Sequence, residues 1–474
     1  MSMIKSFAAM ALCATLAFSV VAPAPALAQG SQHDQIVAHY GGEYDPNGLG
    51  RYVRQIVDRL EPHADLDRPI RHVTVLNSPV INAFATPEGG VYVTRGIIAL
   101  CNSEDELAGI IGHEIGHVAE AHGQGRQGVS ILAGVLGMAL EAAGIGEMGM
   151  LGYNVGANLG LNGYSRGQEE DSDRLGVRYL HRAGYDPYAL HDFFQSMHRE
   201  ARLTQTLAGQ ETSSNRMDFF STHPNTEGRM EAVYNRAQRK GVAEGEIPRI
   251  VNPFLDEIDG MLYGDGDDQG FVRGRNFYHT QLGFTYEVPV DYTIQNGTES
   301  VVAFHDDGSA IIFDLAQHDS GRSMSRYVEQ ELSSELGIPL DNVQGFRVNG
   351  IPAASGQAIV NQNGQQRNVF AVAYDAGNGR IYRFIMSGPR NNKSNVSRGW
   401  IDTMDSFRRL DNGEVAGLHS LTIDVVNVRR RDTVERLANR MAFDDYRIER
   451  FRALNGLGRN GTVERGERVK LVVE

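Results

Sequence analysis

The chain has 474 residues, 41% of them hydrophobic, and a formal net charge of −14 from 59 acidic and 45 basic side chains. This length exceeds what one hydrophobic core accommodates and predicts two or three domains. The acidic balance argues against nucleic acid as a partner and gives no attraction to anionic lipid.

Residues 1–28 have the features of a secretory signal peptide. They contain one charge, Lys5, an apolar run over residues 7–21 and the small-residue site Ala26-Leu27-Ala28. The run is too short for a permanent membrane anchor, so we expect cleavage before Gln29 and an exported protein without a transmembrane segment. One cysteine, Cys101, would then remain, which excludes an internal disulfide.

The first expected elements are a helix and a small group of strands. Apolar residues spaced as on one helix face run from residue 49 to residue 60, and alternation over 71–77 predicts a strand. Residues 80–84 and 91–94 predict two strands around a Pro-Gly turn. Residues 82–93 could form an exposed edge that pairs with an extended polypeptide, or an ordinary core hairpin. The residues proposed for that edge are Asn82, Ala83, Phe84 and Val91.

The stretch 107–122 carries the most chemistry. It contains His113-Glu114-Ile115-Gly116-His117, the HExxH pattern, after capping residues and acids at 102–106. On a helix, His113 and His117 lie one turn apart on one face and can reach a single metal ion, with Glu114 beside them as a candidate base. An apolar stripe should bury this helix; its members are Leu107, Ile110, Ile111 and Val118. The alternative is a core helix with two incidental histidines.

A catalytic zinc site needs a third protein ligand. His122 is the nearest candidate, but its spacing does not fit a metal-binding pattern. Glu169 fits better, because Asp173 lies four residues later on the same helix face and could orient a ligand histidine. The alternative for this acidic run is a solvated helix face. Between the two motifs, the Gly- and Ala-rich residues 128–163 predict buried helices.

HEIGH, then SRGQEEDSD, then Thr222-His223-Pro224 with Arg229, resembles the M48 family of zinc metallopeptidases over about residues 40–240. The resemblance implies a mainly helical, zincin-type domain with a small β-sheet and one zinc ion. The residue roles that it implies are zinc ligands His113, His117 and Glu169, catalytic base Glu114 and supporting carboxylate Asp173. Ser172 stands where the family usually has Ala, and both residues are small.

The same resemblance places His223 and Arg229 at the site. His223 would lie near the zinc, where it could stabilise the tetrahedral intermediate or occupy the open metal position in a resting form. Arg229 would pair with the acidic residues. The alternative for His223 is a structural residue at the start of a helix, just before Pro224.

We expect an α+β chain of several parts. They are a signal peptide (1–28), a metallopeptidase domain (29–250), a linker (251–275), an α+β sandwich domain (276–412) and a C-terminal module (421–474). Alternating strands and a helix over 324–336 indicate the sandwich, which resembles PsbP and Mog1-like proteins. The last segment resembles a LysM module, a βααβ fold that binds peptidoglycan, but Arg431 replaces the usual glycine. It has an excess of basic residues, which suits an anionic wall or partner.

These features predict a periplasmic, zinc-dependent endopeptidase that acts on unfolded or misassembled bacterial envelope proteins. Peptidoglycan and the outer-membrane assembly machinery are further candidate partners. The alternative is a wall-associated chaperone or scaffold with a mainly structural zinc. Glu114 favours the enzyme, because a structural zinc site does not require that acid.

Overall fold

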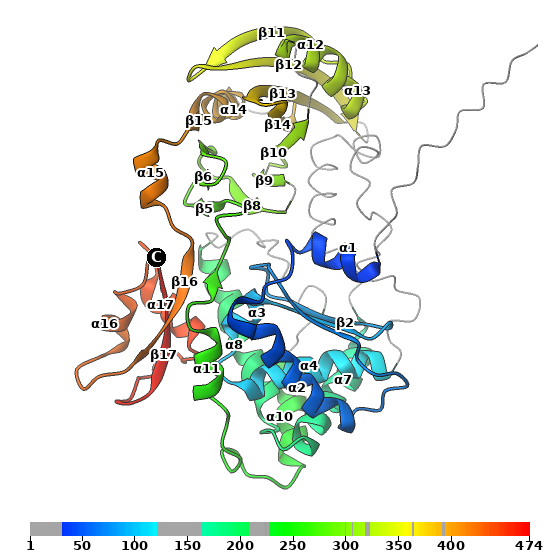
Figure 1. Ribbon diagram of the computed structural model, residues 1–474, viewed down its shortest axis with the longest axis vertical. Coiled ribbons are helices and arrows are strands. Elements are labelled where there is room, and N and C mark those ends of the chain that lie inside the picture. The colour runs from blue at the N-terminus through cyan, green and yellow to red at the C-terminus, as the bar shows by residue number, and fades with distance from the viewer. Residues whose placement is uncertain are drawn as a thin grey trace, which may run out of the picture.

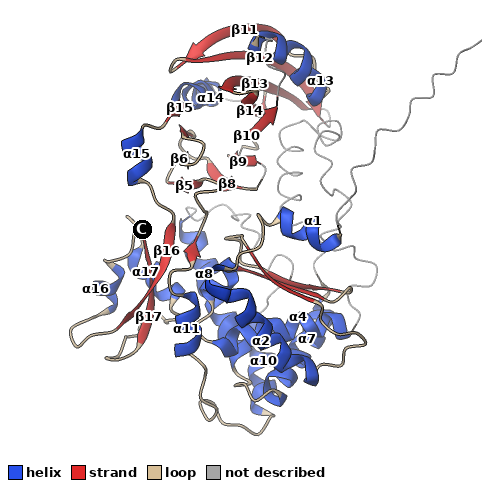
Figure 2. Ribbon diagram, viewed as in Figure 1, coloured by secondary structure: helices blue, strands red, loops and turns tan. Residues whose placement is uncertain are grey.

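The computed structural model describes residues 31–120, 164–207, 223, 227–298, 300–305, 307–317, 323–362, 365–390 and 394–474. The predicted signal peptide, His122 and the predicted helices of 128–163 lie outside these ranges. The described residues form sheets of three, seven, four and three strands. Helices of the N-terminal half gather around the first sheet, and the larger sheets stack above them (Figures 1 and 2).

The N-terminal part is mainly helical, as expected. Its helices are α1 (Gln32–His39), α2 (Leu49–Leu60), α3 (Arg95–Leu100), α4 (Glu104–Ala119), α7 (Arg166–Arg182), α8 (Ala189–Leu207) and α10 (Glu227–Gln238), with short 3-10 turns η1 (Pro46–Gly48) and η2 (Glu61–His63). The helix predicted over 49–60 is confirmed as α2, whose Val53, Ile56 and Leu60 are buried in the common core.

The central helix is α4, which carries the HExxH pattern. It begins where the capping residues predict, because Ser103 Oγ accepts a hydrogen bond from Glu106 N at 3.2 Å. The prediction of a single apolar stripe was too narrow. Every residue from Asp105 to His117 is buried, whereas Val118 is only half-buried. α4 lies at the centre of the domain, in contact with β2, α7 and α8, so polar residues are buried with the apolar ones.

Small residues let α4 and α7 approach closely. A Cβ on Gly116 would lie 3.2 Å from Ser172 Cα, and one on Gly176 would lie 3.2 Å from His113 N. Both distances are tighter than ordinary contacts, so larger residues would push the helices apart. The glycine inside HExxH therefore helps to place the two metal-binding motifs face to face.

The first sheet has the order β1-β3-β2, from β1 (His72–Leu76), β2 (Ala83–Thr86) and β3 (Gly90–Thr94). The predicted pair around the Pro-Gly turn is confirmed, since β2 and β3 are antiparallel. β2 lies at the edge, but Val91 was wrongly assigned to it. Val91 belongs to β3, which hydrogen-bonds to strands on both sides and has no free edge.

The middle of the chain forms two sheets. The seven-stranded sheet contains β8 (Thr293–Asn296), β9 (Ser300–Phe304), β10 (Ala310–Gln317), β11 (Asp341–Val348), β12 (Ile351–Gln362), β13 (Gln365–Gly377) and β14 (Arg380–Pro389). The four-stranded sheet contains β5 (Phe271–Arg273), β6 (Asn276–His279), β7 (Phe284–Glu287) and β15 (Arg408–Arg409). The expected alternation is clear on β14, where Phe384 and Ile385 enter separate cores on the two faces of the sheet.

The helix predicted over 324–336 is confirmed as a continuous run. Its parts are α12 (Met324–Arg326), η3 (Tyr327–Leu332) and α13 (Ser333–Leu336). Its buried side chains, including Val328 and Leu332, pack with Ile385 on one face of the large sheet. Helix α14 (Ser394–Ser406) contributes Trp400 to the core on the other face.

The stretch predicted as a linker is more ordered than expected. It contains α11 (Asn252–Ile258) and β4 (Leu262–Tyr263), and Phe254, Leu255 and Ile258 are buried in the same core as α2. The Asn-Pro pair and the Gly- and Asp-rich run suggested an irregular join, but the apolar residues between them are sufficient to attach this stretch to the domain.

The C-terminal segment has the expected order of strand, helix, helix and strand. After α15 (Asn412–Gly417) come β16 (Leu421–Asn427), α16 (Val434–Ala438), α17 (Arg447–Leu454) and β17 (Arg468–Val473). β4 adds a third strand beside β16, which joins this sheet to the N-terminal part. The LysM assignment and its glycan remain predictions. No helix in the described ranges has both the length and the apolar character required to cross a membrane.

Candidate metal centre

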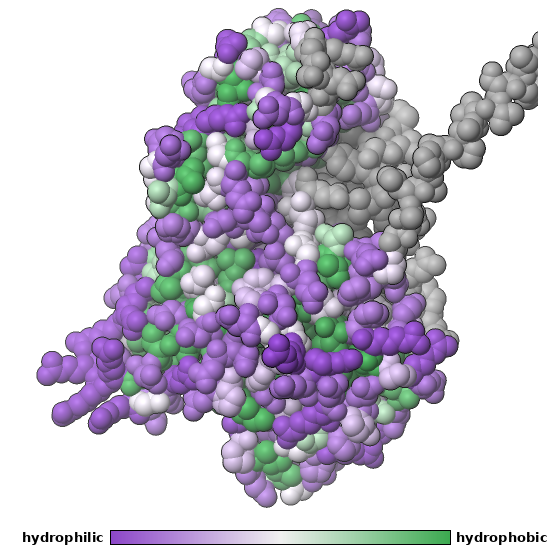
Figure 3. All heavy atoms as spheres, in the orientation of Figure 1, coloured by the Kyte–Doolittle hydropathy of each residue, from purple (hydrophilic) through white to green (hydrophobic). Residues whose placement is uncertain are grey.

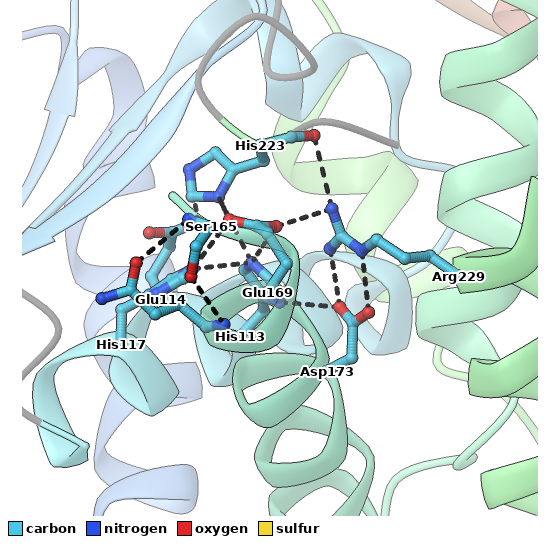
Figure 4. A network of polar contacts seen from close by, with 9 residues as sticks. His113, Glu114, His117, Ser165, Glu169, Asp173, His223 and Arg229 are labelled. Atoms are coloured by element: carbon cyan, nitrogen blue, oxygen red, sulfur yellow. Dashed lines mark hydrogen bonds and ion pairs between the residues drawn. The ribbon is translucent and has the colours of Figure 1, made fainter. Parts of the chain in front are cut away.

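His113 and His117 project from α4 toward Glu169 of α7 (Figure 4). The Nε2 atoms of the two histidines are 3.1 Å apart. Glu169 Oε1 lies 3.4 Å from His117 Nε2, and Glu169 Oε2 lies 3.6 Å from His113 Nε2. All three residues are at most 2% exposed. The fold thus brings together the three residues predicted as metal ligands.

Local structure explains why Glu169 is available. Ser165 caps α7, because its Oγ accepts a hydrogen bond from Gln168 N and its own N–H donates one to Gln168 Oε1, so the helix starts at Arg166. Glu169 therefore lies in the first turn, where the helix dipole favours an ionised carboxylate. Asp173 follows one turn later on the same face, as its spacing predicts.

His223 completes the group. Its Nδ1 lies 3.0 Å from Glu169 Oε1 and 3.4 Å from His113 Nε2. The donor atoms of His113, His117, Glu169 and His223 all lie within 4.8 Å of one another. His223 is 2% exposed, so it is enclosed with the other three rather than placed at the surface.

The donor set fits a zinc ion. Four ligand atoms at zinc's usual bond lengths of about 2.0–2.1 Å, arranged as a tetrahedron, lie about 3.4 Å from one another. The donor pairs given above lie between 3.0 and 3.6 Å apart. Two or three imidazoles with one carboxylate are also ligands that zinc accepts readily.

Asp173 and Arg229 support this group from behind. Asp173 Oδ1 lies 3.0 Å from His113 Nδ1, the ring nitrogen opposite the one that faces the site. Arg229, on α10, donates to both oxygens of Asp173 at 2.8 and 2.9 Å, and its Nη1 lies 2.6 Å from Glu169 Oε2. One guanidinium therefore bridges the supporting carboxylate and a predicted ligand, while Asp173 sets the orientation of His113.

Electrostatics favour the ligand forms that a metal requires. Burial lowers the pKa of His117 well below its usual value and that of His223 to about 4. Burial alone would raise the pKa of Glu169, but hydrogen bonds with His117 and His223 hold it well below the usual range. Neutral imidazoles and an ionised carboxylate are the forms that bind a metal.

Glu114 lies beside the donors without belonging to them. Its side chain is 1% exposed, and Oε1 lies 3.6 Å from His223 Nε2. Burial, together with the charge of Glu169, raises the pKa of Glu114 well above its usual value. A raised pKa makes this carboxylate a better proton acceptor, which is what a general base requires.

Similarity to known proteins agrees with the geometry. The profile of Peptidase family M48 matches residues 49–237. A protease HtpX homolog from Salinibacter ruber is 31% identical over 232 residues, covering 43% of this chain and 82% of that protein. The chain belongs to peptidase family M48. Hydrolysis of peptide bonds is therefore the reaction class of this domain.

Two further similarities have a narrower reach. The beta-barrel assembly-enhancing protease of Yersinia pestis is 31% identical over 205 residues, which cover 41% of this chain and 40% of that protein. The chain thus matches about two fifths of that relative's length. Cyanobacterial PsbP from Synechocystis aligns with 30% of the chain and 98% of its own length, at 12% identity and a TM-score of 0.24. A TM-score this low supports no conclusion about the fold of the two middle sheets.

The M48 site contains two aromatic side chains that sequence reasoning missed. The ring of Tyr164 stacks on His117, with centroids 3.7 Å apart and planes 15° apart. Phe194, on α8, lies 5.1 Å from the guanidinium carbon of Arg229 and makes an edge contact with His113. Tyr164 directly precedes the cap of α7, which was a usable signal, whereas Phe194 is one of many apolar residues and had none.

The predicted substrate edge lies beside the M48 metal helix. β2 contacts α4, and its Ala83 and Ala85 belong to the same core as Ile110. Phe84 points to the opposite face, where its ring stacks on Tyr92. Asn82 precedes the strand, is buried and donates to the Tyr40 hydroxyl at 3.3 Å. Of the four predicted residues, Ala83 and Phe84 lie on the edge strand, Asn82 lies at its start and Val91 lies elsewhere.

Proposed function

We propose that this M48 peptidase is a zinc-dependent endopeptidase that cleaves unfolded or misassembled proteins in the bacterial periplasm. The observation that carries the proposal is the buried set of four donor residues with the Glu114 carboxylate beside it. A chaperone or scaffold with a structural zinc is not supported, because such a site has no use for a buried acid next to the metal.

The chain's residues divide the chemistry among them. His113, His117 and Glu169 hold the metal, which when bound polarises the scissile carbonyl and makes water more acidic. Glu114 accepts the proton of the attacking water and returns it to the leaving amine. Asp173 and Arg229 hold His113 and Glu169 in place, so that the donors do not reorganise during the reaction.

Substrate binding at the edge of the first sheet would explain a broad choice of substrates. The side of β2 that pairs with no strand of the described residues would offer main-chain donors and acceptors to an extended polypeptide, and pairing of this kind depends little on the substrate's sequence. Only unfolded or misassembled segments are extended and unpaired enough to enter. Folded proteins would be spared for that reason.

The proposed location and partners rest on two supports. The N-terminal sequence predicts export, and relatives such as that of Yersinia pestis are called beta-barrel assembly-enhancing proteases. We therefore place the protein in the periplasm and propose misassembled outer-membrane proteins among its substrates. Peptidoglycan remains a candidate ligand for the C-terminal segment.

Removal of the metal tests the function. Treatment with a chelator is expected to abolish cleavage of casein, an unfolded substrate, and added zinc is expected to restore it, because without the ion the carbonyl is not polarised. Elemental analysis should find about one zinc per chain, the number that a single four-donor group holds. Cleavage that survives complete metal removal, or a zinc-loaded protein that leaves casein intact, would contradict the proposal. A tightly folded protein serves as the control substrate and should resist cleavage.

His223 provides a second test within the same site. We propose that it occupies the fourth metal position at rest and leaves when substrate binds, because its donor atom lies within 4.8 Å of those of His113, His117 and Glu169 in this conformation. His223→Ala is then expected to increase cleavage of a short unstructured peptide several-fold. His198→Ala, an exposed histidine on α8, is the control and should change nothing. A large loss of activity in His223→Ala would instead assign His223 to stabilising the tetrahedral intermediate.

A further inference from the structure

One buried lysine connects the last strand to the N-terminal part. Lys470, on β17, is 1% exposed, and its Nζ donates to Ala99 O at 2.7 Å and to Cys101 O at 2.6 Å. These carbonyls belong to the last turn of α3 and the residue that follows it, where a cation is favoured by the helix dipole. Burying an ammonium group costs free energy unless its hydrogen-bond partners are in place. Lys470 therefore depends on these two carbonyls much more than the members of a surface ion pair depend on each other.

The carbonyls that accept hydrogen bonds from Lys470 lie immediately before α4, the helix that carries His113 and His117. Cys101 is followed by Asn102 and by Ser103, the cap of α4. Glu106, in the first turn of α4, accepts a hydrogen bond from Asn102 N at 3.0 Å. Burial lowers the pKa of Lys470 to about 8, and Glu106 is the main group that opposes this shift. Lys470 therefore acts on the loop that starts α4, about three turns before His113.

Other contacts keep Lys470 in this position. Asn455 accepts a hydrogen bond from Lys470 N at 2.7 Å and donates to Lys470 O at 2.9 Å. Gly456 adjoins the same loop, since a Cβ there would lie 3.1 Å from Asn102 Nδ2. Helix α17 also packs on α8 and α3. The C-terminal segment is thus fitted against the loop rather than tethered at a distance, although its distal loops project from the molecule as a hydrophilic surface (Figure 3).

The remaining acids of the first turn of α4 are held by the N-terminal part itself. Glu104 accepts hydrogen bonds from the hydroxyls of Tyr52 and Tyr185 at 2.6 and 2.7 Å. Asp105 accepts from Asp186 N and Ile250 N at 2.9 and 2.8 Å. Before the turn, Glu106 holds Asn102 N while Lys470 donates to the carbonyls of Ala99 and Cys101, so the C-terminal segment supplies part of the anchorage of this loop.

We propose that Lys470 is a positioning residue, through which the C-terminal segment fixes the start of α4 and thereby the placement of His113, Glu114 and His117. The inference deepens the proposed function and rests on it for its catalytic readout. It assigns the C-terminal segment a role in activity, in addition to any role in docking. A small displacement of the ligands is sufficient to slow catalysis and loosen the metal.

Lys470→Met tests the inference, with Leu437→Ala as the matched control. Leu437 is buried in the core of the same segment, away from the loop, so its truncation weakens the segment without removing the contact. In Lys470→Met we expect kcat to fall and zinc loss to a chelator to quicken, each by about tenfold, with KM unchanged. In the metal-free protein, residues 102–106 should exchange their amide hydrogens faster. Leu437→Ala should lower the melting temperature and leave all three readouts near wild type.

Wild-type zinc loss and amide exchange in Lys470→Met would overturn the inference. Equal changes in Leu437→Ala would also overturn it, because general loss of stability would then explain both variants. If Lys470→Met does not fold, Asn455→Ala, which frees the Lys470 backbone, should show the same changes to a smaller degree, and wild-type behaviour there would overturn the inference. If wild-type protein fails to cleave casein, the proposed function fails, while zinc loss and amide exchange still decide the role of Lys470.

Discussion

Glu114→Gln is expected to lower the rate of casein cleavage by about 10²- to 10⁴-fold, the usual contribution of a positioned general base. The amide keeps the size of the carboxylate but cannot accept the proton of the attacking water. The side chain is buried beside the donors and is not one of them, so its replacement should not release the metal. The measurements are initial rates on casein and the zinc content of the purified variant.

A control variant and a control measurement distinguish loss of the general base from other causes of lost activity. Glu120→Gln changes an exposed acid at the end of the same helix, where it pairs with Arg174 at the surface, and should retain full activity. Zinc content in Glu114→Gln should equal that of the wild type. Retained activity in Glu114→Gln would remove Glu114 from the mechanism, and loss of zinc together with activity would assign it to the metal instead.

Arg229→Met is expected to destabilise the metal-free protein by about 3–5 kcal/mol, the usual effect of removing one partner from a buried ion pair. Arg229 is 3% exposed and contacts both Asp173 and Glu169, which are themselves fully enclosed. Without the guanidinium, the two buried carboxylates lose the one cation that pairs with both of them. Urea unfolding of the metal-free variant and wild type, followed by circular dichroism, measures the difference.

A double variant and a surface control separate this effect from general damage. Arg229→Met with Asp173→Asn removes one of the stranded charges, so it should be more stable than Arg229→Met alone. Arg239→Met, at an exposed position just after α10, should change the free energy of unfolding by no more than about 0.5 kcal/mol. If Arg229→Met unfolds at the wild-type urea concentration, the bridge does not stabilise the site.

Much of the metal centre was predictable because its signals are local. A separation of four residues puts His113 and His117 on one helix face, and the same separation relates Glu169 to Asp173. The side chains of Ser103 and Ser165 each accept a hydrogen bond from the backbone N–H three residues later. Each helix start therefore depends only on residues within one turn. These features depend on the 3.6-residue period and on capping, which operate within one turn.

Other features of the same site were not predictable from any local pattern. Val91 was assigned to the substrate edge, but it lies on β3, which is the central strand between β1 and β2. The residues of one strand do not indicate which position that strand takes in a sheet. The resemblance to the M48 family placed Arg229 near the acids. That one guanidinium would contact both Asp173 and Glu169 depended on how α7 and α10 pack.

The sequence by itself indicated which two histidines share one helix face, which acid stands beside them and where the helix that carries them begins, because hydrogen bonds and helix periodicity act over a few residues. The resemblance to the M48 family supplied the full set of predicted metal ligands. Only the tertiary structure decided that His223 lies within 4.8 Å of the other donors, that the stretch after residue 251 joins the first core and that Lys470 reaches the loop before α4. Those contacts join residues far apart in the chain. Burial makes them strong, since charges removed from water must be matched by partners that only the folded chain brings within reach.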